Sequence, residues 1–260
     1  MGAWFGKLIG GTAGFFIGGP IGAVLGAVIG HSFDRRAGGQ TTSRRSSTAW
    51  GRGGPQTFTA NDQSQMIFFL ATFSMLGKMA AADGRVSTEE VRAIEDFIDR
   101  NLRLNNAEKQ FAMRIVSTSA VSHEPFEKFA QQFYSMFNRQ PEMLQTMYDI
   151  LYKVASADNT ITPDEKKILD SATKIFNLRS SGSSTSYSSA GSSDKNYTVL
   201  ECKRTDDNDT IKAAYKRLVK DFHPDAIASK GLPEEFTKFA AQKFREINQA
   251  YEEIRKERNF

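Results

Sequence analysis

A long uncharged segment near the start of the chain restricts what this sequence can fold into. No charged residue lies between Leu8 and Gly30, and at 1.5 Å per residue a helix of this length crosses a bilayer core of about 30 Å. The sequence therefore predicts a membrane anchor over residues 1–34, with one transmembrane helix at about residues 8–30. The run is too long for a secretory signal peptide, and no clear small-residue cleavage site follows it.

The charges on either side of this run indicate its orientation. Only Lys7 precedes it, whereas a cluster of arginines follows it: Arg35, Arg36, Arg44, Arg45 and Arg52. By the positive-inside rule, we expect a single-pass protein with the N-terminus outside the cytoplasm and the C-terminal domains inside it. The net charge is only +4, so the arginines are interpreted as topology signals and no nucleic-acid partner is expected.

Glycines recur at every fourth position of the predicted span and form a stripe without side chains: Gly10, Gly14, Gly18, Gly22, Gly26 and Gly30. Such a stripe lets two helix backbones approach closely, so the sequence predicts a homodimer that forms through the span. The alternative is that glycine is simply frequent in membrane helices. Pro20 is expected to kink the helix and to limit how far the stripe stays straight.

Two polar segments divide the rest of the chain. Residues 35–57 are rich in Gly, Ser, Thr and Arg, and residues 179–194 consist almost entirely of Ser, Gly and Thr, so both are predicted to be flexible linkers. They separate a middle domain at 58–178 from a C-terminal domain at 195–260. Apolar residues in both domains return every three or four positions without a strand pattern, which predicts an all-α protein. The single cysteine, Cys202, excludes a disulfide framework and is interpreted as a core residue.

The middle domain contains an internal repeat, in which a polar turn precedes a capped helix. The segment from Ala82 to Glu90 matches the segment from Ala157 to Glu165. In each, a Ser or Thr lies three residues before the Glu, which is the spacing of a capping box. Prolines at 125 and 141 favour two more helix starts. This pattern resembles the tellurite-resistance TerB-like helical domain over residues 58–178.

The acidic residues of these turns also allow a metal-binding hypothesis. Asp83 with Glu90, or Asp158 with Glu165, could supply oxygen ligands to a hard cation. Arg85 occupies a position where an EF-hand needs an oxygen ligand, so that motif is excluded. We expect turn and capping roles for these residues, no bound metal and no cofactor. The alternative function kept open is a membrane-bound stress or metal sensor in which this domain carries the main activity.

The C-terminal region combines a basic amphipathic helix with an abrupt stop. The helix is predicted to start with Asp209 as its N-cap, and one of its faces is a positive ridge of Lys212, Lys216, Arg217 and Lys220. His223 precedes a proline, so the helix should end there and the chain should turn at Pro224 and Asp225. A second helix after Pro233 completes an antiparallel pair, with His223-Pro224-Asp225 exposed at its tip.

These features together resemble a J domain: Tyr197 to Leu200, Ala213 to Leu218, His223-Pro224-Asp225, and Lys243 to Tyr251. The resemblance implies a partner, a DnaK-type chaperone ATPase. In that family the basic helix docks on an acidic surface and the tripeptide promotes ATP hydrolysis by the partner. Such charge complementarity raises the association rate more than the affinity. Ala226 departs from the family pattern, in which a basic residue often follows the tripeptide.

The order of the regions resembles the DjlA family of membrane-anchored J proteins, as does the segment from Ala228 to Glu235. This resemblance implies a regulatory co-chaperone of the bacterial inner membrane, with an unknown client or signalling protein bound at the TerB-like domain. We do not expect an enzyme, since His31 and His123 lack partners at metal-ligand spacing and no phosphate-binding loop or nucleophile elbow occurs in the sequence.

Overall fold

The computed structural model describes residues 18–34, 59–157, 160–178, 192–223 and 232–260. Every regular element in these ranges is a helix, which confirms the all-α prediction for the described residues. Several predicted features lie outside these ranges: Gly10, Gly14, the 35–57 linker, Asp158, most of the 179–194 linker, Pro224 and Asp225.

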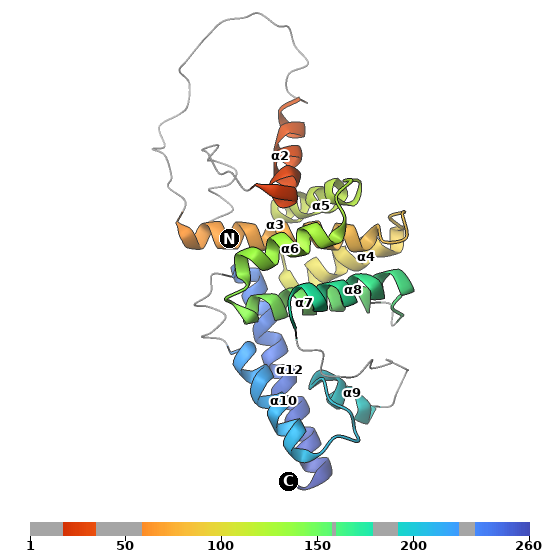
Figure 1. The fold of residues 1–260 in the computed structure, drawn as a ribbon, viewed down its shortest axis with the longest axis vertical. Helices are drawn as coiled ribbons and strands as arrows, with labels where there is room; N and C mark the ends of the chain where they lie inside the picture. The colour runs from red at the N-terminus through yellow and green to blue at the C-terminus, as the bar shows by residue number, and fades with distance from the viewer. Residues whose placement is uncertain (1–17, 35–58, 158–159, 179–191, 224–231) are drawn as a thin grey trace, which may run out of the picture.

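A bundle of helices forms the middle of the molecule (Figure 1). Its elements are α3 (Ala60–Ala80), α4 (Thr88–Phe97), the short π-helix η1 (Ile98–Leu102), α5 (Asn106–Ala120), α6 (Phe126–Phe137), α7 (Pro141–Ala155) and α8 (Pro163–Ile175). Helix α3 contacts α4, α5, α6 and α7, and nearly all of its side chains beyond the first two turns are buried. A helix that is buried on all sides is a core helix. At Gly77, α3 lies so close to α5 that a Cβ atom would be 2.2 Å from the Ser119 Oγ.

Local sequence signals set where the bundle helices begin. Four of them start with a capping box, in which the cap side chain and the third helical residue satisfy each other's backbone N–H groups: Thr59 with Asp62, Ser87 with Glu90, Asn105 with Glu108, and Thr162 with Glu165. The boxes at α4 and α8 are those that the sequence predicts. The other two use Asn at the cap or Asp at the third position, outside the usual Ser/Thr and Glu/Gln pattern. Helix α6 starts directly after its N-cap Pro125, and α7 starts at Pro141, as expected.

The N-terminal helix α2 (Gly19–Asp34) lies against α3, α5 and α6 of the bundle. Its buried side carries Ile21, Val24, Leu25 and Val28, which have the three- and four-residue spacing of one helix face. The side chain of Gln132 on α6 accepts a hydrogen bond from the Ile21 N–H at 3.0 Å. The start of α2 is therefore attached to the bundle by both apolar and polar contacts.

The start of α2 differs from the predicted continuous span. Gly18 is not helical and Gly19 has a φ angle of 73°, so the helix begins here and does not run on unbroken from Leu8. Pro20 consequently lies in the first turn, where the missing N–H costs nothing, and it does not kink a helix interior. Among the helices that the structure describes, none combines the length and apolar character needed to cross a bilayer.

The described part of the C-terminal region contains three helices: α9 (Ser192–Val199), α10 (Asn208–Asp221) and α12 (Glu234–Arg258). Helices α10 and α12 run side by side in opposite directions, and α12 extends from the bundle to the C-terminus of the chain (Figure 1). Helix α12 has 25 residues and α10 has 14. The first turns of α12 therefore have no counterpart in α10, and they contact the bundle at η1.

Candidate functional site

The antiparallel pair of α10 and α12, called the hairpin below, is held together by ring stacking and a buried apolar seam. The rings of Tyr215 and Tyr251 stack with their centroids 3.8 Å apart, and the Tyr215 hydroxyl donates a hydrogen bond to Asn248 Oδ1 at 2.8 Å. Ile211 and Leu218 are buried in the same seam. These contacts fix which face of α10 is exposed.

Helix α10 begins two residues earlier than predicted. The side chain of Asp207 caps it by accepting a hydrogen bond from the Thr210 N–H at 2.6 Å, and this bond keeps the pKa of Asp207 below its usual value. The prediction of Asp209 as the N-cap is therefore wrong, and Asp209 lies in the first turn. The earlier start also brings Asn208 Oδ1 within 3.2 Å of the Arg258 guanidinium, which ties the beginning of α10 to the end of α12.

The chain leaves α10 at the tip of the hairpin. Phe222 caps the helix with a fully buried ring, and the next residue, His223, is exposed. The His223 ring lies edge-on to Phe244 of α12, with 5.9 Å between the ring centroids. The change from a buried to an exposed side chain at adjacent residues places His223 on the surface at the point where the helix stops.

The four cations of the predicted positive ridge do not share one environment. Lys216 and Lys220 are exposed, and Lys212, four residues before Lys216, lies with its Nζ 5.1 Å from the centroid of the Phe260 ring. Arg217 occupies the neighbouring face and forms an ion pair with Glu201. The ridge therefore consists of three lysines in a row and one arginine held to the side.

Helix α10 contacts α7 of the bundle, and Arg217 is linked to α7 through its ion pair with Glu201. Gln145 of α7 donates hydrogen bonds from its Nε2 to Glu201 Oε1 at 3.3 Å and to Asp149 Oδ1 at 3.4 Å. Asp149 is buried, and its pKa is raised to about 6, mainly by this burial. The charges of Glu201 and Asp221 contribute to the rise, while Lys243 of α12 and the hydrogen bond from Gln145 oppose it. Gln145 thus links α7 of the bundle to Glu201 of the C-terminal region.

The first turns of α12 enter the bundle core. Phe236 is fully buried, and its ring centroid lies 5.0 Å from that of Phe68 and 6.2 Å from that of Phe69. Phe239 packs edge-on against Phe97 at 5.7 Å. The apolar pattern of α12 predicts that both residues are buried, but it does not show that their neighbours belong to the middle domain. The signal that could have revealed this is the length of the apolar stripe, which exceeds what α10 can cover.

The acidic turns of the bundle have structural roles. Glu90 accepts a hydrogen bond from the Ser87 N–H at 2.7 Å, and Glu165 accepts one from the Thr162 N–H at 2.8 Å. Asp83 accepts one from the Arg85 N–H at 2.9 Å within its turn. No group of three potential metal-binding side chains occurs in the described ranges. The capping roles predicted for the two glutamates are confirmed.

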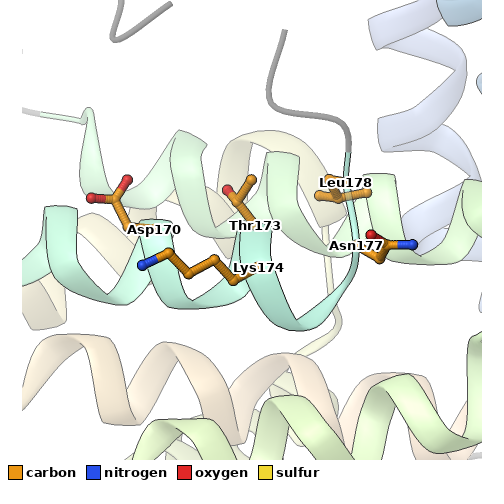
Figure 2. A pocket seen from close by; sticks show the side chains of 5 residues that line it. All are labelled: Asp170, Thr173, Lys174, Asn177 and Leu178. Atoms are coloured by element: carbon orange, nitrogen blue, oxygen red, sulfur yellow. The ribbon is translucent and has the colours of Figure 1, made fainter. Parts of the chain in front are cut away.

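Two other features are a depression beside α8 and the buried thiol of Cys202. Figure 2 shows an open depression lined by residues from the end of α8 and just beyond it: Asp170, Thr173, Lys174, Asn177 and Leu178. All of these come from one short stretch of chain, so the depression does not bring distant groups together.

Cys202 is buried, as predicted, and burial raises the pKa of its thiol to about 11. A thiol with this pKa is a poor nucleophile at neutral pH.

Three family models match parts of the chain. They are described as the Co-chaperone DjlA transmembrane domain over residues 1–52, Tellurite resistance protein TerB over residues 69–185, and the DnaJ domain over residues 195–259. The resemblances to TerB-like and J domains are therefore confirmed. No solved structure matches the chain.

Curated proteins named Co-chaperone protein DjlA match over almost the whole length. The chain is 30% identical to the Coxiella burnetii protein over 98% of both chains. It is 29% identical to the Photobacterium profundum protein, over 98% of this chain and 99% of that one, and 28% identical to the Escherichia coli K12 protein over 99% of both. With this coverage and the order of the three matched regions, the chain belongs to the DjlA family of J-domain co-chaperones.

Proposed function

We propose that this protein is held at a membrane and stimulates ATP hydrolysis by a DnaK-type chaperone through its J domain. The observation that carries this proposal is the tip of the hairpin, where the exposed His223 follows the buried Phe222 directly. The exposed lysines of α10 lie beside this tip on the same short helix. The match to the DnaJ domain over residues 195–259 supports the same function.

The arrangement of charge supports a two-part mechanism. Lys212, Lys216 and Lys220 form a positive row that attracts an acidic surface of the chaperone and raises the rate of encounter. Arg217 joins this surface when it exchanges Glu201 for an acidic group of the partner. The tripeptide His223-Pro224-Asp225 then engages the chaperone. The ATP and the groups that hydrolyse it belong to the partner, so this chain acts as a regulator and not as an enzyme.

The substitution His223→Gln tests this function. We expect it to abolish the stimulation of chaperone ATP turnover in a steady-state assay and to leave the helical content of the chain unchanged, because the side chain is exposed. The matched control is His123→Gln, at an exposed histidine of the bundle, and it should stimulate like the wild type. Full stimulation by the His223→Gln variant would rule out the proposed role of the tip.

We further propose a single-pass inner-membrane topology with the N-terminus outside the cytoplasm and the domains divided as the sequence suggests, at 58–178 and 195–260. The uncharged run, the arginines after it and the match to a DjlA transmembrane domain support this topology. A homodimer through the glycine stripe is supported by Gly26 of α2, which is exposed and has no atom within 4 Å of where a Cβ would stand.

Replacing Gly18 and Gly22 together with Leu tests the dimer. Two added side chains prevent close approach of the backbones, so we expect a weaker signal in a reporter of membrane-span association. The matched control replaces Ala23 and Ala27, which are exposed on another side of α2, with Leu. Equal signals from the two double variants would remove the glycine stripe as the dimer contact.

A further inference from the structure

The first turns of α12 attach the J domain to the TerB-like bundle through an aromatic contact. Phe236 inserts between rings of α3, with Phe68 at 5.0 Å and Phe73 at 6.3 Å between centroids. Leu232, Phe239 and Ala240 are buried around it. Apolar burial of this kind favours the docked arrangement and acts without directional bonds.

The same contact contains groups that oppose docking. Asp149 and Glu235 are both buried, and Asp149 Oδ2 and Glu235 Oε2 find no hydrogen-bond partner among the described residues. Burial raises the pKa of both carboxyl groups. A buried carboxylate with an unsatisfied oxygen costs free energy that is recovered when water reaches it. The contact therefore combines an attractive aromatic part with an unfavourable acidic part, which is the balance that a reversible contact needs.

The contact lies at the functional end of the hairpin. Helix α10 runs toward the bundle, so its last residues and His223 are at the end nearest to α7 (Figure 1). Burial raises the pKa of Asp221 near the end of α10, and the charge of Glu142 on α7 adds to this rise. His223 packs against Phe244, which follows Phe236 on α12 by eight residues, roughly 12 Å along a helix. A chaperone that approaches the tip therefore meets the bundle next to it.

Arg217, one of the four cations of the positive ridge on α10, is also held by the contact between bundle and hairpin. Arg217 is paired with Glu201, and Glu201 in turn accepts the hydrogen bond from Gln145 of the bundle. Release of the bundle removes the bridge that positions Glu201 and exposes the Arg217 side of α10.

We propose that the TerB-like bundle is a docking partner for the J domain of its own chain, and that the docked state restrains access of the chaperone to the tip and to Arg217. Phe236 anchors this contact and Gln145 bridges it. When a client or signalling protein binds the bundle, the J domain undocks, and the stimulation of ATP hydrolysis by the chaperone increases. This inference rests on the proposed stimulation of a DnaK-type ATPase and adds a control to it.

The substitution Gln145→Glu tests the restraint without touching the aromatic core. It places a third carboxylate between Glu201 and Asp149 and removes the donor that joins them, so repulsion favours the undocked state. We expect the full-length chain, reconstituted in vesicles, to stimulate chaperone ATP turnover about fivefold more than the wild type at subsaturating concentration, as for a modest coupling between sites. Hydrogen exchange of the backbone at residues 232–242 should become faster in the same variant.

The matched control is Gln131→Glu, which adds the same charge at an exposed glutamine of α6 and should leave both measurements unchanged. A second variant, His223→Gln combined with Gln145→Glu, should lose all stimulation if the gain acts through the tip. Where the wild type stimulates the chaperone, stimulation by Gln145→Glu that equals or falls below the wild-type value overturns the restraint, whatever the exchange rates show. If neither the wild type nor Gln145→Glu stimulates the chaperone, the proposed function itself fails.

Discussion

The two ends of α12 are held in different ways. At its start, Phe236 and Phe239 are surrounded by aromatic rings of the bundle. At its other end, Arg258 donates hydrogen bonds to the Tyr197 hydroxyl at 2.8 Å and to the Asp206 carbonyl oxygen at 2.6 Å, and its guanidinium lies 5.0 Å from the centroid of the Tyr197 ring. One helix therefore belongs to the bundle core at one end and to the J domain at the other.

This difference separates two properties of the J domain. The polar contacts of Arg258, the cap of α10 and the stacked Tyr215 and Tyr251 join segments of the C-terminal region to each other, so they stabilise the shape of the hairpin. The aromatic contacts of Phe236 join α12 to α3, more than 150 residues earlier in the chain, so they set where the hairpin lies on the bundle. Shape and position can therefore be changed separately by substitution.

The largest expected effect comes from breaking the aromatic end with Phe236→Ala. Removal of a fully buried ring leaves a cavity in the bundle core and is expected to lower the free energy of unfolding by about 3–5 kcal/mol. The measurement is chemical denaturation followed by circular dichroism. We expect the wild type to unfold in a single transition. In the variant, the hairpin should unfold at a lower denaturant concentration than the bundle, because the bundle no longer stabilises it.

The control for this prediction is Phe244→Ala, eight residues further along the same helix. Phe244 is only partly buried, so its removal should cost less than the removal of Phe236. Equal losses from the two substitutions would contradict the view that the two ends of α12 lie in different environments.

The comparison also shows which features the sequence could predict. The capping boxes at Ser87 and Thr162, the stop before Pro224 and the exposed His223 depend on residues within a few positions of each other, so they could be predicted from spacing alone. The prediction of Asp209 as the cap of α10 was wrong, and Asp207 is the cap, because both residues have the right chemistry and spacing alone does not choose between them. With the earlier start of α10 at Asn208, the Asn208 side chain accepts a hydrogen bond from Arg258 at the end of α12.

The docking of Phe236 could not be predicted because nothing local distinguishes its partners. An apolar stripe shows that a helix face is buried, and it does not identify the face that covers it. The raised pKa of Asp149 has the same origin, since its burial and the negative charges of Glu201 and Asp221 act together only after the two regions meet. The two domains could therefore be predicted from the sequence, whereas the contact between them could not.

A smaller effect is expected from Asp149→Asn, which sharpens the comparison by changing only the acidic side of the contact. The pKa of Asp149 is about 6 in the folded chain, above the model-compound value of 3.8. The folded state therefore binds the proton more tightly than the unfolded state does, so wild-type stability is lost as the pH rises from about 4 through about 6 and stays lower above that range.

Asparagine carries no charge to desolvate, so the variant should lack this loss. At pH 7.5 we expect it to be more stable than the wild type by about 1–3 kcal/mol, because one pKa unit corresponds to about 1.4 kcal/mol. At pH 4 the two chains should unfold at nearly the same denaturant concentration. Asp221 and Glu235 also have raised pKa values, but they are present in both chains and largely cancel in the difference.

The matched control is Asp170→Asn, at an exposed position of α8, and its stability difference from the wild type should not change with pH. If Asp149→Asn destabilises the chain at pH 7.5, the carboxylate is a net favourable part of the contact and the acidic side does not oppose docking. If it stabilises the chain and also lowers the stimulation of the chaperone, the two results together link the strength of the contact between bundle and hairpin to the restraint on the J domain.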